Sequence, residues 1–143
     1  ERLIIKSIEH FCRPKVYPNF LKNLIKTRSN KKIKRIGCTD SSDGLFQALQ
    51  DLASASKCKA IINYEKIPKD KDWPRGDKWD EYYFFGGEDY ELVFSLPKKW
   101  AKNLSKLDKD INEIGFFTNG EPSIEFKDSN KNKLFNNTPF KHF

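Results

Sequence analysis

The sequence predicts an α+β fold in which helices pack against a mixed β-sheet. Helical and strand patterns are intermixed along the 143 residues, and one pair of predicted strands is separated by a turn that suits an antiparallel hairpin. Aromatic residues make up 14% of the chain and include 12 Phe, enough apolar material for a packed core. A chain of this length forms one domain more readily than two. We therefore expect a single domain over residues 1–143.

Two short helices and one strand are expected in the first 40 residues. The first helix ends before Pro14, because a proline ring blocks the next helical turn. Asn19 is expected to cap the second helix. A strand follows over residues 33–39 and ends at Asp40. The apolar side chains expected to face inward are Leu3, Ile4, Ile5, Ile8 and Phe11 in the first helix and Phe20, Leu21, Leu24 and Ile25 in the second.

The strongest helical pattern begins at Ser42 or Asp43 and ends near Ser56. Its apolar side chains recur with a period close to 3.6 residues. A strand is expected over residues 58–64, and residues 65–80 are expected to form a long polar loop with at most one turn of helix. The apolar stripe of the helix consists of Leu45, Phe46, Leu49, Leu52 and Ala53.

The second half of the chain predicts three strands and one helix. A strand over residues 89–96 places Tyr90, Leu92 and Phe94 on one face. The helix over residues 97–107 begins with Pro97, which suits a first helical turn. Strands 111–118 and 123–127 are joined through the turn dipeptide Asn119-Gly120 and are expected to pair as a hairpin. The helix is expected to turn Trp100, Leu104 and Leu107 inward.

Composition excludes several classes of protein. No apolar run approaches the roughly 20 residues of a membrane span. The three cysteines form no CxxC pair, which argues against a zinc site and favours a reducing cytoplasm. The net charge is +7, and residues 1–36 alone hold eleven Lys and Arg against two Glu. This basic segment leaves open a nucleic-acid-binding module, although no aromatic side chain is interleaved with the cluster at 31–35.

An acidic turn, Asp-Ser-Ser-Asp-Gly-Leu at 40–45, lies where a predicted strand ends and a helix begins. Helix N-termini favour anions such as phosphate, and carboxylate oxygens are the ligands that Mg²⁺ prefers. Asp40 and Asp43 are therefore candidate Mg²⁺ ligands, and the hydroxyl of Ser42 suits a phosphate or ribose oxygen. The alternative is simple N-capping of the helix by Ser or Asp.

A second acidic stretch, Gly-Gly-Glu-Asp-Tyr-Glu-Leu at 86–92, begins with a diglycine. Glycine permits tight bends and close backbone approaches, so the diglycine is expected to present the following acids in a cleft. Taken alone, the stretch also fits an ordinary turn into an edge strand with solvated acids.

The two acidic stretches, in this order, resemble the C-terminal domain of the thiamine-monophosphate kinase family. That family is part of the superfamily of aminoimidazole ribonucleotide synthetase. His10, the pair Arg13-Pro14 and the closing residues 140–143 also resemble the family's pattern, so the match extends over essentially the whole chain. The resemblance implies an ATP- and Mg²⁺-dependent kinase that converts thiamine monophosphate to thiamine diphosphate.

The family's functional residues carry over to five positions of this sequence. Asp40 and Asp43 would bind Mg²⁺, and Ser42 would contact the nucleotide. Glu88 would bind the substrate, and Phe140 would stack on one of its rings. Which of the C-terminal aromatic residues makes that contact stays open.

Family members also have an N-terminal domain that supplies further metal-binding Asp residues and a dimer interface. This chain begins at Glu1 and contains no Met, so we expect it to be the C-terminal portion of a longer polypeptide that forms a homodimer. Alone, the 143 residues are expected to be inactive. A superfamily member that acts on a different phosphate acceptor is the nearest alternative.

Overall fold

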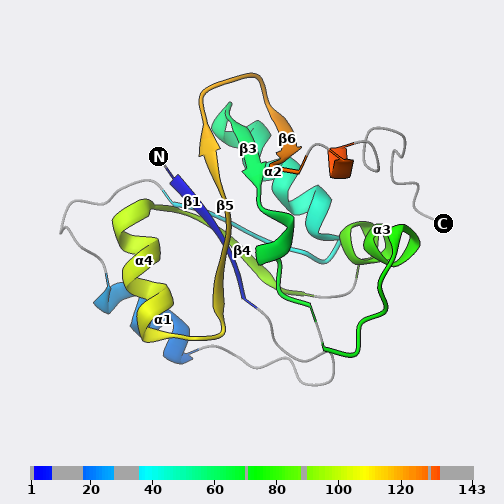
Figure 1. Ribbon diagram of the computed structural model, residues 1–143. Helices are drawn as coiled ribbons and strands as arrows, with labels where there is room; N and C mark the ends of the chain where they lie inside the picture. The colour runs from blue at the N-terminus through cyan, green and yellow to red at the C-terminus, as the bar shows by residue number, and fades with distance from the viewer. Residues whose placement is uncertain are drawn as a thin grey trace.

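Helices and strands are interspersed in the computed structural model, which describes residues 2–7, 18–27, 36–69, 71–87, 90–128 and 130–132 (Figure 1). In chain order the elements are β1 (Arg2–Ser7), α1 (Pro18–Lys26), β2 (Gly37–Asp40), α2 (Leu45–Ser56), β3 (Lys59–Ile62), the 3-10 helix η1 (Tyr64–Lys66), α3 (Asp77–Phe85), β4 (Leu92–Pro97), α4 (Lys98–Leu107), β5 (Ile111–Thr118) and β6 (Ser123–Phe126).

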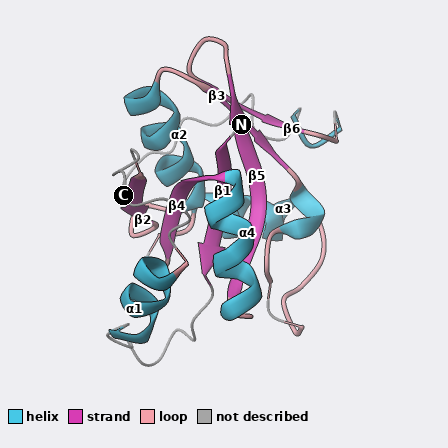
Figure 2. Ribbon diagram, turned by 90° about the vertical axis from the view of Figure 1, so that its left-hand side faces the viewer, coloured by secondary structure: helices cyan, strands magenta, loops and turns pink. Residues whose placement is uncertain are grey.

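The six strands of the described residues form one sheet in the order β2-β4-β1-β5-β3-β6. Neighbouring strands are antiparallel except for β3 and β6, which are parallel. Helices α1 and α4 cover one face of this sheet, and α2 and α3 lie on the other (Figures 1 and 2). This arrangement confirms the predicted α+β class with a mixed sheet and packed helices. No helix in the described ranges is long and apolar enough to cross a membrane.

Each face of the sheet has its own hydrophobic core. On the α2–α3 face, α2 buries four of the five side chains of its predicted stripe, and Phe46 packs against them partly buried. Phe84 and Phe85 of α3 close this core. On the opposite face, α1 and α4 pack against β4 and β5. The buried residues of that second core are Leu24, Phe94, Leu96, Trp100, Ala101, Leu104 and Ile111.

Helices α1 and α4 are joined by a buried indole. Trp100 Nε1 donates to the carbonyl oxygen of Leu24 at 2.9 Å and lies 3.1 Å from Oγ1 of Thr27. The prediction that Trp100 and Leu104 point inward is confirmed, whereas Leu107 is 52% exposed at the helix end. Helix α1 begins at Pro18 and so does not have Asn19 as its cap.

The prediction of a helix near the N-terminus is wrong, because Arg2–Ser7 forms strand β1. β1 lies between β4 and β5 and pairs antiparallel with both. A continuous apolar run such as Leu-Ile-Ile is typical of a strand that is covered on both faces, and periodicity alone does not separate it from a helix.

Residues 77–85 form helix α3, whereas residues 65–80 were expected to form a long loop with at most one turn of helix. Its first turn carries Asp77 and Asp80, which suit the positive end of a helix. Tyr82, Phe84 and Phe85 are aromatic residues of modest helix propensity, so the local signal was weak. The burial of Phe84 and Phe85 against α2 holds this helix in place.

The predicted hairpin of β5 and β6 is also wrong. Strand β3 lies between them, pairing with β5 through Ala60 and Phe117 and with β6 through Ala60 and Ile124. Residues 119–122 therefore cross the end of β3, where Gly120 lies close to Lys59. A turn dipeptide shows where a chain reverses, and it does not show which strand fills the space beside it.

Candidate active site

The acidic turn connects β2 to α2 and is held by its own hydrogen bonds. The backbone N–H of Ser42 donates to Oδ1 of Asp40 at 3.0 Å, and Gly44 N–H donates to the carbonyl of Ser41 at 2.9 Å. Hydrogen bonds from the hydroxyl and the backbone N–H of Ser42 hold the pKa of Asp40 below its ordinary value. Asp40 and Asp43 are both exposed, so the turn presents two carboxylates to solvent.

No side chain caps the N-terminus of α2. Gly44 occupies the N-cap position with φ of 93°, and it has no side chain that could accept from the first helical turn. The first turn of α2 carries no acidic residue. Ser42 and Asp43 therefore are not the helix cap, and the N-capping alternative does not account for them. The positive end of the helix dipole lies beside the turn instead.

The diglycine lies directly against the acidic turn. A Cβ added to Gly87 would be 2.3 Å from the carbonyl oxygen of Ser42. A Cβ added to Gly44 would be 2.9 Å from the carbonyl oxygen of Phe84 and 3.2 Å from that of Gly86. Real Cβ atoms do not approach backbone at 2.3 Å, so these positions are occupied by glycine for steric reasons. The two acidic stretches thus meet, backbone to backbone.

Ser41 and Glu91 join the same two stretches a second time. Ser41 N–H donates to the carbonyl of Glu91 at 2.9 Å, and Glu91 N–H donates to Oγ of Ser41 at 3.1 Å. Ser41 is fully buried, and Glu91 is 5% exposed. These bonds continue the β2–β4 ladder beyond its last pair, Asp40 with Leu92. The stretch that starts at Gly87 therefore also contacts the acidic turn at its far end, through Glu91.

Tyr90 lies within this loop in a left-handed backbone conformation. Its φ is 50°, which is uncommon for a residue with a Cβ. Its side chain is 62% exposed. Such conformations cost roughly 1–3 kcal/mol and gather at ligand-binding sites. The strained residue therefore supports a functional assignment for the loop.

The chemistry of the turn fits part of a site for a hard divalent cation. Asp40 and Asp43 offer carboxylate oxygens, which are the donors that Mg²⁺ prefers. Among the described residues, no group of three or more His, Cys, Asp and Glu side chains could hold a metal ion. Asp40 and Asp43 therefore fit as part of a larger set of Mg²⁺ ligands.

The structure brings together Asp40, Ser42 and Asp43 and places the diglycine beside them. Glu88 and Phe140 lie outside the described residues. No role was predicted for Ser41, although it stands inside the acidic turn. Its position directly after the exposed Asp40 at the end of a strand was the signal that it would turn inward, since side chains alternate along a strand.

Comparison with known proteins identifies relatives of this chain. The family described as AIR synthase related protein, C-terminal domain, matches residues 20–127. The chain is 35% identical over 123 residues to the thiamine-monophosphate kinase of Prochlorococcus marinus, a match that covers 86% of this chain and 37% of the kinase. It is 37% identical over 108 residues to that of Nitrosopumilus maritimus, covering 73% of this chain and 34% of the kinase. The chain thus spans little more than a third of these relatives.

Solved structures share the fold. AaThiL complexed with AMPPCP and TMP aligns with a TM-score of 0.61 and 24% identity, covering 99% of this chain and 51% of that one. The hydrogenase maturation protein HypE in complex with ATP aligns with a TM-score of 0.60 and 11% identity, covering 88% of this chain and 48% of that one. The family match covers most of the residues that build the sheet, both cores and the acidic turn. The chain therefore belongs to the family described as AIR synthase related protein, C-terminal domain.

Proposed function

We propose that this chain is the C-terminal domain of an ATP- and Mg²⁺-dependent kinase that phosphorylates thiamine monophosphate to thiamine diphosphate. The observation that carries the proposal is the backbone contact between Gly87 and Ser42, which joins the two acidic stretches in one place. The likeness to thiamine-monophosphate kinases over 86% of the chain supports this substrate. We also propose that residues 1–143 form one domain that works with an N-terminal domain of the same polypeptide.

The acidic turn forms the nucleotide side of the proposed site. Asp40 and Asp43 would hold Mg²⁺, and Ser42 would contact the nucleotide. When bound, Mg²⁺ would neutralise charge on the phosphates during transfer. The hydrogen bond from Ser42 N–H to Asp40 keeps that carboxylate ionised and fixes its direction. The metal ligands that this turn lacks would come from the N-terminal domain.

The loop after the diglycine forms the acceptor side. Glu88 would bind thiamine monophosphate, because a carboxylate accepts hydrogen bonds from an aminopyrimidine. Phe140 would stack on a substrate ring, with Phe143 as the other aromatic residue of the tail that could do so. Gly87 brings the start of this loop against Ser42, and Glu91 brings its end against Ser41.

The proposed reaction needs alignment of anions more than a strong base. An oxygen of the acceptor phosphate, already ionised, would form a bond to the γ-phosphorus of ATP as the bond to the ADP oxygen breaks. Catalysis of such transfers comes mainly from positioning and from compensating charge. The two loops of this chain would supply the positioning. A homodimer in the cytoplasm is proposed for the complete polypeptide.

Turnover of thiamine monophosphate, ATP and Mg²⁺ by the complete polypeptide that includes this chain tests the proposal. We expect thiamine diphosphate to form, and we expect Asp43→Asn and Glu88→Ala each to lower kcat/KM by about 100-fold or more. Asp51→Asn is the matched control, because Asp51 is an exposed residue of α2 whose carboxylate accepts a hydrogen bond from the side-chain amide of Gln47. If Asp43→Asn or Glu88→Ala kept near-parental activity, the assignment of that residue to the site would be wrong. The isolated 143 residues should form no product.

A different phosphate acceptor is the second candidate, because the fold, which HypE in complex with ATP shares at 11% identity, does not by itself fix the acceptor. A panel of phosphate acceptors, assayed with ATP and Mg²⁺, separates the two candidates. A better substrate than thiamine monophosphate in that panel would favour the alternative. Binding of nucleic acid through the basic segment at 1–36 is not favoured by the relatives, and it would show as affinity for RNA or DNA that falls steeply with salt.

A further inference from the structure

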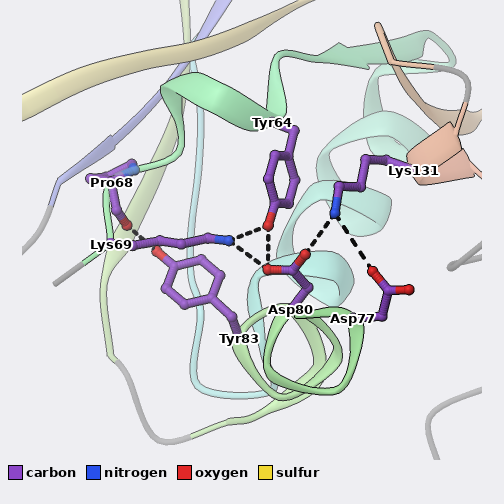
Figure 3. A network of polar contacts seen from close by, with 7 residues as sticks. All are labelled: Tyr64, Pro68, Lys69, Asp77, Asp80, Tyr83 and Lys131. Atoms are coloured by element: carbon purple, nitrogen blue, oxygen red, sulfur yellow. Dashed lines mark hydrogen bonds and ion pairs between the residues drawn. The ribbon is translucent and has the colours of Figure 1, made fainter. Parts of the chain in front are cut away.

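Asp80 is a buried carboxylate of α3 that binds side chains from two other segments (Figure 3). Its side chain is 4% exposed and accepts hydrogen bonds from the hydroxyl of Tyr64, from Lys69 Nζ at 2.7 Å and from Lys131 Nζ at 2.8 Å. Tyr64 and Lys69 belong to the segment after β3. Lys131 lies in the helical turn at 130–132. One carboxylate therefore joins α3 to two segments that are distant in sequence.

The charges around Asp80 are balanced only while its carboxylate is present. Lys69 Nζ and Lys131 Nζ lie 4.1 and 4.3 Å from the ring centroid of Tyr64, and their side chains are 21% and 20% exposed. Burial alone would raise the pKa of Asp80, but hydrogen bonds from Lys131, Lys69 and Tyr64 outweigh it and lower the pKa. Loss of the carboxylate would leave Lys69 Nζ beside the Tyr64 hydroxyl and Lys131 Nζ 3.9 Å from the carboxylate of Asp77. Two largely buried ammonium groups would then have lost their closest counter-charge, which is costly.

A second bond ties the same helix to the same segment. The hydroxyl of Tyr83 donates to the carbonyl oxygen of Pro68. Tyr83 lies three residues after Asp80, so the two side chains share one side of α3. The segment 64–69 therefore holds the helix at two points, one of them through charge.

The C-terminal end of α3 lies against the acidic turn of the candidate site. The helix ends at Phe85, and the N–H of its C-cap residue, Gly86, donates to the carbonyl of Tyr82 at 2.6 Å. The carbonyl oxygen of Phe84, one turn after Asp80, is 2.9 Å from the position of a Cβ on Gly44. A small shift of α3 would therefore move the diglycine relative to the acidic turn.

We propose that Asp80 is a positioning residue, which holds α3 so that the diglycine and the loop after it stay against the acidic turn. The inference deepens the proposed function and rests on it for the role of that loop. The proposed metal and nucleotide residues lie at the end of β2 and in the turn before α2, whereas the proposed acceptor residue Glu88 follows α3 in the chain. Asp80 therefore acts on acceptor binding and leaves the nucleotide side in place.

The test compares Asp80→Asn with the parent in the complete polypeptide. We expect KM for thiamine monophosphate to rise about tenfold while KM for MgATP changes by less than about twofold, since only acceptor binding is loosened. A general loss of folded enzyme would lower the apparent kcat without this split. Glu125→Gln is the matched control, because Glu125 is a 48% exposed carboxylate 2.5 Å from Lys59 Nζ. It should leave both KM values at the parental level.

Hydrogen exchange followed by mass spectrometry gives a readout that needs no activity. In Asp80→Asn the amides of residues 82–87 should exchange about tenfold faster, while those of β5 keep the parental rate. Tyr64→Phe and Lys131→Met, each of which removes one donor, should change the same amides in the same direction by less. These two variants keep the test decisive if Asp80→Asn does not fold.

Three results would overturn the inference: unchanged exchange at 82–87 in the folded variants, equally faster exchange in β5, or equal changes in both KM values. Absence of any thiamine-monophosphate kinase activity in the parent would instead contradict the proposed function. The exchange measurement would still decide whether Asp80 holds α3 and the diglycine in place.

Discussion

Gly87 packs so closely on Ser42 that a Cβ on the glycine would be 2.3 Å from the serine carbonyl oxygen. The two residues are 45 positions apart and belong to different acidic stretches. Their contact, together with the bonds between Ser41 and Glu91, makes one structural unit of two loops. Each loop on its own would be a common turn, and the contact between them brings the two acidic stretches into one place.

Gly87→Ala tests whether that close approach is required. The added methyl group meets backbone atoms that cannot rotate away, so we expect a loss of stability of about 1–3 kcal/mol and a larger loss of turnover. Chemical denaturation and steady-state kinetics measure the two effects. Ser54→Ala, at an exposed position of α2, is the control for a substitution to Ala. Full activity in Gly87→Ala would show that the loops tolerate separation.

Ser41→Ala and Ser95→Ala form a matched pair of buried serines. Both residues are fully buried, but Ser41 Oγ accepts from Glu91 N–H, whereas Ser95 Oγ has no hydrogen-bond partner among the described residues. Ser41→Ala should cost about 1–2 kcal/mol, because it removes the hydroxyl acceptor of a buried N–H. Ser95→Ala should be neutral within about 0.5 kcal/mol or stabilising. Equal losses in urea denaturation would contradict the role given to Ser41.

Acid should destabilise the fold partly through Asp80. Hydrogen bonds from Lys131, Lys69 and Tyr64 outweigh burial and lower its pKa in the folded state, whereas an unfolded Asp has a pKa of about 3.9. The contribution of Asp80 to stability is therefore present above that value and is lost as the pH falls below about 4. Urea midpoints between pH 7 and pH 3 should fall more steeply in the parent than in Asp80→Asn. Parallel curves would refute this prediction.

Trp100→Phe tests the independence of the two faces of the sheet. The change removes the hydrogen bond to the Leu24 carbonyl and loosens α1 from α4, so we expect a loss of about 1–2 kcal/mol in thermal or urea unfolding. The candidate site lies at the N-terminus of α2, across the sheet from this indole. Turnover of the folded variant should therefore stay at the parental level. A selective rise in either KM would show coupling through the sheet.

Local sequence patterns predicted the elements whose buried side chains lie along one face. The stripe of α2 recurs at helical spacing, and β5 combines apolar residues with a turn at its end, so both were found. β1 was mistaken for a helix because its partners, β4 and β5, come about 90 and about 110 residues later. No local rule supplies such partners.

The sequence indicated the two motifs of the candidate site, whose residue roles stay predictions, but it did not show the contacts that join them. The acidic turn and the diglycine stood out as motifs, but the contact of Gly87 with Ser42 depends on α3, which the sequence did not reveal. The contacts of Asp80 could not be predicted for the same reason. Its neighbours in space, Lys69 and Lys131, are 11 and 51 residues away along the chain.

The central claim is that the acidic turn and the diglycine loop serve one site. The most direct test is a crystal structure of the complete polypeptide with Mg²⁺, a non-hydrolysable ATP analogue and thiamine monophosphate. We predict a Mg²⁺ ion about 2.1 Å from a carboxylate oxygen of Asp40 or Asp43, with thiamine monophosphate bound by Glu88 in the same cavity. Electron density for either ligand at a separate place on the molecule, with these carboxylates unengaged, would contradict the claim.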